Sequence, residues 1–200
     1  MSKRFSMNTE EILGQDLVNE LNSTLSAKVV RELYRGAAST LTWDKQAPSG
    51  VSFTEHILSF TAKLAQAENT ILAQSGQLTG NISYIVGSDV AGILRAMPGF
   101  VPVTDVRASS GTHLYGTLDG RPVIRSLVMP SDEMIMATKS DDGFSSSVVY
   151  APYMPLFISN QMNGQDHNPL KAQKVAATMC GIKSVNPFLS TKIKILNATI

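Results

Sequence analysis

Few side chains of this sequence have the types and spacing that chemistry requires. No two of the three histidines, His56, His113 and His167, lie within fifty residues of each other, whereas metal-binding helices and loops place their ligands a few residues apart. The one cysteine, Cys180, lies in the apolar run ATMCGI, where a buried thiol is usually inert. We therefore predict no metal centre, no thiol nucleophile and no cofactor.

Two short motifs imitate functional sites. Gly87-Ser88-Asp89 stands between an expected strand and helix, but it lacks the second glycine of a nucleophile elbow and the lysine of a phosphate-binding loop. Capping of the helix by Ser88 is the simpler interpretation. Asp141-Asp142-Gly143 lacks the alternating ligands of a calcium loop, which favours a solvated turn. The sequence thus predicts that the protein is not an enzyme, and a hydrolase using Ser88 or Cys180 is the weakest hypothesis.

The overall charge excludes other classes of function. The 200 residues include 17 basic and 16 acidic side chains, so no global field attracts nucleic acid or an acidic membrane. The sequence has no apolar run of roughly 20 residues and no signal peptide, so we expect synthesis in the cytoplasm. Only 16% of residues are charged, below the usual value of about 25%. This indicates a surface that partners cover, or one rich in uncharged polar residues.

The first quarter of the chain is expected to form one helix and a loop. Apolar residues recur at steps of three and four over 9–35, which predicts an amphipathic helix that ends at Gly36, either continuous or broken near 22–26. The small residues, proline and glycine of 37–52 predict a loop that carries the only tryptophan, Trp43.

A second helix has stronger signals. Ser52 and Glu55 form a capping box, apolar residues continue at helical spacing over 53–75, and Gly76 follows as a stop. At 1.5 Å per residue this helix is about 33 Å long, which is the width of a small domain. We expect it to span the body of the protein.

The middle of the chain has the pattern of a β-rich region. Residues 82–87 read as a buried strand, followed by a short helix that Ser88 caps and Pro98-Gly99 ends. A hairpin is expected around Asp119-Gly120, then a strand at 133–138 and a polar loop at 139–147.

The segment VVYAPYMPLFI, residues 148–158, carries no charge and contains Pro152 and Pro155. Alternation places Val148, Tyr150, Pro152, Met154, Leu156 and Ile158 on one face, and Val149, Ala151, Tyr153, Pro155 and Phe157 on the other. Both faces are therefore apolar, while the prolines cannot donate to a strand ladder. An edge strand whose outer face is covered by a partner explains both features. Ordinary two-sided core packing under a helix is the alternative.

The segment 148–185 reads as one long hairpin with a loose tip. Arg121 and Arg125 form a local pair of cations beside the shorter hairpin. They are either exposed hairpin charges or half of a salt bridge between subunits.

The sequence SSVVYAPYMPLF resembles a motif of the major capsid proteins of tailed bacteriophages of the T-even type, in which Tyr-Ala-Pro-Tyr-x-Pro-Leu precedes a long hairpin. The matching residues are Tyr150, Ala151, Pro152, Tyr153, Pro155 and Leu156. The segments 17–33, 53–94 and 185–189 are similar to family segments that occur in the same order.

The resemblance implies an α+β protein with the fold named after phage Hong Kong ninety-seven. That fold has a peripheral domain, with a spine helix and a long β-hairpin, and an axial domain whose loops meet at the symmetry axes of the capsomer. On this sequence the peripheral domain covers 1–85 and 148–185, with the spine helix at 53–75, and the axial domain covers 86–147 and 186–200.

Two features depart from the family pattern. The family carries Thr-Arg-Tyr-Gly on the returning strand, where this chain has Thr178-Met179-Cys180-Gly181, so an arginine contact does not carry over. The family also has an N-terminal arm and an extended loop ahead of the spine helix. We expect both to be missing here, which indicates a fragment, a divergent relative or a function carried by another chain.

The resemblance implies a structural subunit of a viral capsid shell that assembles into capsomers around a phage genome and resides in the virion. Its expected partners are copies of itself and other capsid or scaffolding proteins, with packaged DNA contacted only weakly and no membrane. The candidate interface residues are Tyr150, Pro152, Tyr153, Pro155, Phe157, Arg121 and Arg125. The alternative is a capsid-derived binding module, which a host or scaffolding partner recognises through tips at 104–113 and 139–147.

Overall fold

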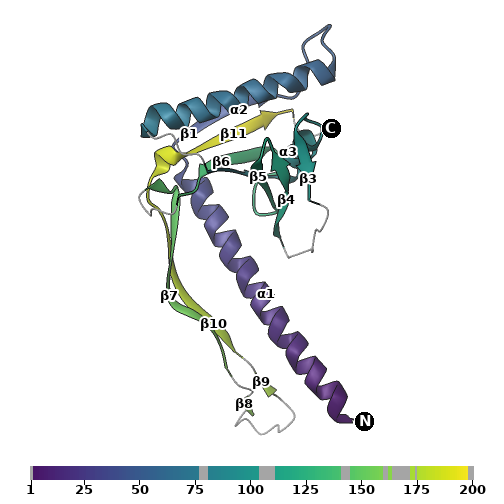
Figure 1. Ribbon diagram of the computed structural model, residues 1–200, viewed down its shortest axis with the longest axis vertical. Coiled ribbons are helices and arrows are strands. Elements are labelled where there is room, and N and C mark those ends of the chain that lie inside the picture. Colours follow the sequence, from purple (N-terminus) through teal and green to yellow (C-terminus); the bar gives the residue numbers. More distant parts are fainter. Residues whose placement is uncertain are drawn as a thin grey trace.

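The computed structural model describes residues 2–76, 81–103, 111–140, 145–159, 162–163, 172–173 and 175–197 (Figure 1). Its helices are α1 (Ser2–Gly36), α2 (Phe53–Ser75), α3 (Ser88–Arg95) and a 3₁₀ helix, η2 (Pro187–Leu189). The strands are β1 (Ser39–Asp44), β2 (Ile82–Val86), β3 (Phe100–Pro102), β4 (Thr112–Leu118), β5 (Arg121–Ser126), β6 (Glu133–Thr138), β7 (Val148–Ile158), β8 (Met162–Asn163), β9 (Ala172–Gln173), β10 (Ala176–Ser184) and β11 (Ser190–Leu196).

Seven strands form one mixed sheet in the order β1-β11-β6-β2-β5-β4-β3. The pairs β1 with β11 and β2 with β5 are parallel, and the other neighbours are antiparallel. The long strands β7 and β10 pair only with each other among the described strands, and β8 and β9 form a separate short ladder. The sheet is therefore the body of the molecule, and β7 with β10 projects from it (Figure 1).

The central strand β6 shows why helices cover both faces of the sheet. All six of its residues are buried. Met134 and Met136 belong to a hydrophobic cluster with α2 and α3, whereas Ile135 and Ala137 belong to a second cluster with the end of α1. Successive side chains of a strand point to opposite faces, so an apolar run needs a cover on each side.

Helix α2 has the bounds that the sequence predicts. The backbone N–H of Ser52 donates to Glu55 Oε2 at 3.3 Å, and Gly76 adopts φ of 65° at the end of the helix. A left-handed residue of this kind is a common helix stop, and glycine adopts it without steric cost. The residues that α2 buries are Ile57, Phe60, Leu64, Ala67 and Ile71, as their spacing predicts.

The strands predicted at 82–87 and 133–138 and the hairpin at Asp119-Gly120 are also confirmed. Asp119 and Gly120 have φ of 49° and 78°, the conformation that a tight two-residue hairpin requires.

Two predictions for the first quarter of the chain are wrong in detail. The helix predicted at 9–35 begins at Ser2 and runs through 22–26 without a break. Asparagine, serine and threonine each cost only fractions of a kcal/mol in a helix, so a short polar stretch does not interrupt one that is anchored at its end. That anchor is the burial of Val30 and Leu33 against the sheet.

The loop predicted at 37–52 contains strand β1, which pairs with β11 from Ser39 to Asp44. Trp43 is only 4% exposed, and its indole N–H donates to Ser59 Oγ at 2.9 Å. The small polar residues of β1 hide a strand because only Leu41 and Trp43 carry its apolar face.

Ser88 does not cap α3 as predicted, because the helix begins at Ser88 and Gly87 is the capping residue. A Cβ atom at position 87 would overlap the carbonyl oxygen of Pro130, so the close approach of these two backbones requires glycine there.

Helix α1, not α2, accompanies the long hairpin. Its last turns contact the sheet, and the turns that precede them lie beside β10 and β7 (Figure 1). Helix α2 lies on the opposite face of the sheet, against β1, β11 and η2. The seven-stranded sheet contains strands from both predicted domains. Because a shared sheet does not mark where one domain ends and the other begins, the domain boundaries at 85/86 and 147/148 stay a prediction. No helix among the described residues is long and apolar enough to cross a membrane.

A polar junction fixes the root of the hairpin. Ser147 Oγ donates to the carbonyl oxygen of Leu189 at 2.7 Å, and Thr138 Oγ1 donates to the same oxygen at 3.2 Å. On the other strand, the backbone N–H of Ser184 donates to Glu32 Oε1 of α1 at 3.3 Å. The hairpin is therefore tied to both the sheet and α1 where it leaves the body.

We predict that Gly36→Ala destabilises this junction. A Cβ atom on Gly36 would lie 2.6 Å from Ser184 Cβ and closer still to its Oγ. The clash should lower the free energy of unfolding by about 1 to 3 kcal/mol, measured by urea denaturation. Ser184→Gly in the same chain should recover most of the loss.

The matched control is Gly92→Ala in α3, where a Cβ meets no atom within 4 Å. This change should raise the free energy of unfolding by roughly 0.5 to 1 kcal/mol, because alanine favours helix. Equal stability of Gly36→Ala and the unmodified chain would contradict the prediction.

Candidate interaction surface

The predicted catalytic candidates do not come together. His56 stacks on Trp43, with ring centroids 5.1 Å apart, and its Nε2 lies 2.7 Å from the carbonyl oxygen of Asp44. His113 faces Arg125 across the β4–β5 ladder, and His167 lies outside the described residues. Cys180 lies on β10, which pairs with β7, whereas Ser88 begins α3, which packs against the seven-stranded sheet. No cluster of three or more potential metal ligands occurs in the described part of the chain.

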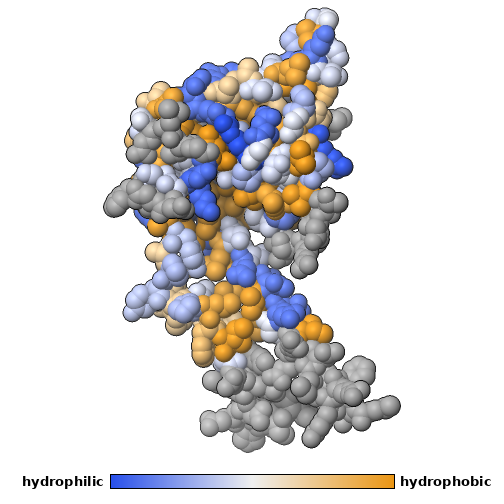
Figure 2. All heavy atoms as spheres, in the orientation of Figure 1, coloured by the Kyte–Doolittle hydropathy of each residue, from blue (hydrophilic) through white to orange (hydrophobic). Residues whose placement is uncertain are grey.

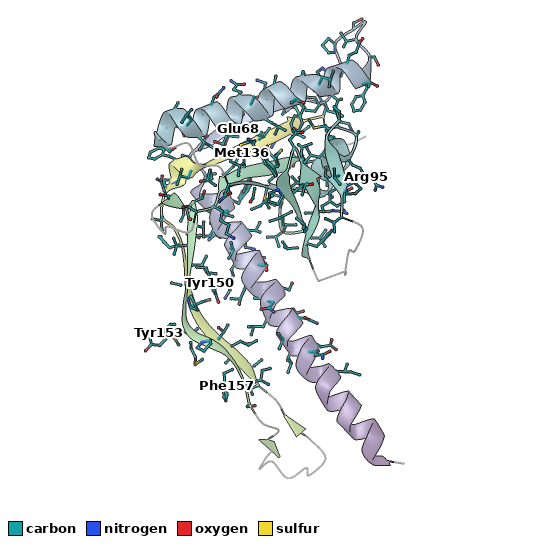
Figure 3. The ribbon with its side chains drawn as sticks, in the orientation of Figure 1. Glu68, Arg95, Met136, Tyr150, Tyr153 and Phe157 are labelled. Atoms are coloured by element: carbon teal, nitrogen blue, oxygen red, sulfur yellow. The ribbon has the colours of Figure 1, made fainter. Side chains whose placement is uncertain are left out.

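An unusual surface lies on β7 between Tyr150 and Ile158, where all nine residues are exposed. Tyr153 is 84% exposed and points away from α1, and Phe157 is 58% exposed (Figure 3). On β10, Met179 is 57% exposed. Figure 2 shows hydrophobic residues over β7 and β10 beside hydrophilic residues over α1. We call the exposed set the ribbon surface, and its members are Tyr150, Tyr153, Met154, Leu156, Phe157, Ile158 and Met179.

The two prolines of β7 lie at shifts in its pairing with β10. Pro152 is opposite Cys180, but Met154 is opposite Met179, so one residue of β7 is extra between them. A second residue is extra between Met154 and Phe157, which is opposite Ala177. Bulges of this kind leave a residue out of the ladder. Pro155 lies within the second shift, where its missing N–H is accommodated, whereas Pro152 borders the first shift, at which Tyr153 is the extra residue.

The bulges also change which side chains share a face. Residues directly opposite in an antiparallel ladder lie on the same face. Tyr150 is opposite Ile182, and Met154 is opposite Met179. Because Ile182 and Met179 are three residues apart on β10, they point to opposite faces of that strand. The predicted assignment of Met154 to the face of Tyr150 is therefore wrong, because strict alternation does not survive a bulge. The alternative of two-sided core packing is also wrong, since β7 is exposed from Tyr150 onward.

Arg121 is engaged within its own chain. Its guanidinium forms an ion pair with Glu68 of α2, where Nη2 donates to Oε2 at 3.1 Å, and Nη1 donates to Tyr84 Oη at 2.9 Å. It thereby holds the β4–β5 hairpin to α2, and its part in a subunit interface stays a prediction. Arg125 has a buried Nε without a hydrogen-bond partner among the described residues. Sequence alone missed Glu68 and Tyr84, because neither lies near Arg121 along the chain.

The sequence matches the family described as major capsid protein Gp23 over residues 1–195. The chain belongs to this family. No curated protein sequence matches it. The resemblance seen in the motif around Tyr150 to Leu156 is therefore confirmed at the level of the family.

The fold is also that of solved structures from phages, a cyanophage capsid among them. A structure from Mycobacterium phage Che8 has 16% identity and a TM-score of 0.60, and covers 94% of this chain and 63% of its own. One from Gordonia phage Cozz has 12% identity and a TM-score of 0.58, covering 94% and 64%. The capsid of the cyanophage P-SCSP1u has 12% identity and a TM-score of 0.53, covering 98% and 66%. The predicted α+β fold of the Hong Kong ninety-seven type is confirmed, and this chain spans 63–66% of those chains.

We predict a pH dependence that comes from Tyr84. Burial, and then the charge of Asp119, raises the pKa of Tyr84 from 10.0 to about 12. The folded chain holds this phenolic proton more tightly than the unfolded chain, so the stabilisation is complete below pH 10 and is lost as pH rises from 10 to about 12. Denaturant unfolding at pH values from about 8 to 11 should show a shallower fall in stability for Tyr84→Phe. Equal slopes for the two chains would contradict this.

Proposed function

We propose that this chain is a structural subunit of a viral capsid shell and that the ribbon surface is one of its contacts with neighbouring copies. The observation that carries the proposal is the exposed apolar segment from Tyr150 to Ile158, in a chain of a major capsid protein family. Large apolar side chains grouped on a surface mark interaction sites, and a two-stranded ladder has no core in which to bury them.

We further propose a division of the chain that differs from the sequence-based one. Helix α1 with β7 and β10 forms the peripheral part, and the seven-stranded sheet with α2 and α3 forms the axial part. The support is that α1 contacts both strands of the hairpin, whereas α2 packs against β1, β11 and η2. In this division the spine helix is Ser2–Gly36.

Repetition makes a modest contact sufficient. Burial of a side chain such as Phe157 or Tyr153 is worth about 1.5 to 3 kcal/mol. A pair of ribbons buries only a few such side chains, but closed symmetry repeats each contact in every subunit. Other capsid or scaffolding proteins are the proposed further partners. The net charge of +1 supports only weak, non-specific contact with packaged DNA in the virion.

We predict that Tyr153→Ser with Phe157→Ser weakens self-association at least about tenfold, since 1.4 kcal/mol corresponds to a factor of ten and two large side chains are removed. The free energy of unfolding should change by less than about 0.5 kcal/mol, because both residues are exposed. Sedimentation velocity over a concentration series measures the first quantity, and urea denaturation the second.

The matched control is Leu58→Ser on α2, where Leu58 is 53% exposed and far along the chain from the ribbon. It should leave association within about threefold of the unmodified chain. If the ribbon variant associates as the unmodified chain does, the ribbon surface is not the contact. If the unmodified chain assembles only after another capsid or scaffolding protein is added, that protein is the partner that covers the ribbon.

A further inference from the structure

Helix α1 carries groups of opposite charge along one open face. Asp16 and Glu20 lie near the middle of the helix, and Lys28, Arg31 and Arg35 lie toward its C-terminal end. All five side chains are exposed. We call these five residues the charge stripe.

The stripe faces away from the body of the protein. A helix turns by about 100° per residue, so the five side chains fall within about 120° of its circumference. Val30 and Leu33, which α1 buries against the sheet, lie on the other side. The stripe is therefore one continuous surface, available to another helix.

The cationic end of the stripe borders a groove between α1 and β10. The groove has a volume of about 370 Å³ and is lined by Lys28, Arg31, Glu32, Arg35, Cys180 and Ile182. Glu32 accepts a hydrogen bond from the backbone N–H of Ser184. Within the described part of the chain, Lys28, Arg31 and Arg35 form no ion pair within 4 Å.

Like charges on one helix face disfavour the isolated chain. Arg31 and Arg35 are four residues apart, as are Asp16 and Glu20, and pairs of like charge at this spacing destabilise a helix. A partner that brings carboxylates to the arginines and cations to the acids removes both repulsions. The two spacings are equal, about 6 Å along the helix axis, so the acidic pair fits the basic pair.

A second copy of the same helix satisfies this requirement. In an antiparallel pair with a two-fold axis between residues 25 and 26, Asp16 lies opposite Arg35 and Glu20 lies opposite Arg31. One register satisfies both pairings, and symmetry repeats them in the other half of the interface.

We propose that α1 pairs antiparallel with α1 of a second copy through the charge stripe, and that the carboxylates of Asp16 and Glu20 bind at the cationic groove of the partner subunit. This inference rests on the proposed function, because it names one way in which shell subunits contact each other. It adds a polar, salt-sensitive contact to the apolar one at the ribbon surface.

Charge reversal tests the pairing. The acid-reversed chain is Asp16→Lys with Glu20→Lys, and the cation-reversed chain is Arg31→Glu with Arg35→Glu. Each should self-associate at least about tenfold more weakly than the unmodified chain at about 50 mM salt, because like charges then face each other. The difference should shrink at about 1 M salt, where the screening length falls to about 3 Å.

Two further samples separate this effect from misfolding. An equimolar mixture of the two reversed chains should form mixed dimers, since one stripe is then cationic and the other mainly anionic. The chain with all four changes should associate within about threefold of the unmodified chain. The matched control, Lys63→Glu with Arg95→Glu, makes the same change in net charge as the cation-reversed chain at a half-buried and an exposed position outside α1, and should not alter association.

Other outcomes overturn the inference. If all reversed chains associate as the unmodified chain does, the helix pair is wrong, while the ribbon variants still report on the proposed function separately. If the acid-reversed chain binds duplex DNA more tightly than the unmodified chain, with unchanged association, the cations serve a nucleic acid instead. If the unmodified chain stays monomeric at every concentration, with or without added capsid proteins, the proposed function fails together with the inference.

Discussion

A two-stranded antiparallel ladder cannot enclose a hydrophobic core, and the rest of this structure depends on that constraint. Strands β7 and β10 satisfy each other's backbone along most of their length, but among the described residues no third strand pairs with them and no layer covers them beyond the part that α1 reaches. The apolar side chains from Tyr150 to Ile158 therefore stay exposed in the single chain. A group of large apolar side chains exposed in this way marks an interaction site.

The prolines reconcile this exposure with a chain that has to remain unaggregated before assembly. A long, flat, apolar edge would pair with any similar strand. Pro152 borders one shift in the β7–β10 register and Pro155 lies within a second, and such bulges twist a strand and interrupt its free hydrogen-bonding edge. Side-chain packing remains available to a partner, while open-ended backbone pairing is disfavoured. The ribbon surface is thereby restricted to partners of complementary shape.

Local signals predicted much of the fold. The capping box at Ser52, the apolar run of β6 and the turn at Asp119-Gly120 each carry their cause within a few residues, and each was confirmed. The errors arose where the cause is distant. Strand β1 forms because Trp43 fills a space under α2, and the face of Met154 depends on a register set by β10.

The same distinction applies to the candidate site. The apolar character of 148–158 was readable because eleven residues without a charge need no partner to be recognised. The engagement of Arg121 was not, because Glu68 and Tyr84 meet it only when α2 packs over the sheet. A single sequence shows which residues are unusual, whereas their partners follow from topology.

Helix α1 connects the two kinds of surface in one rigid element. Its 35 residues extend about 52 Å, and about 26 Å of that length separates the core contacts of Leu33 from the exposed Asp16. Glu32 and Gly36 of α1 contact Ser184 of β10 close to the sheet. A force on the ribbon surface or on the charge stripe is therefore transmitted to the sheet through these three residues. An apolar contact holds at any salt concentration but tolerates several orientations, whereas paired charges at fixed spacing select one. Together they allow neighbouring copies to associate strongly while the helix sets the angle between them, which a closed shell requires.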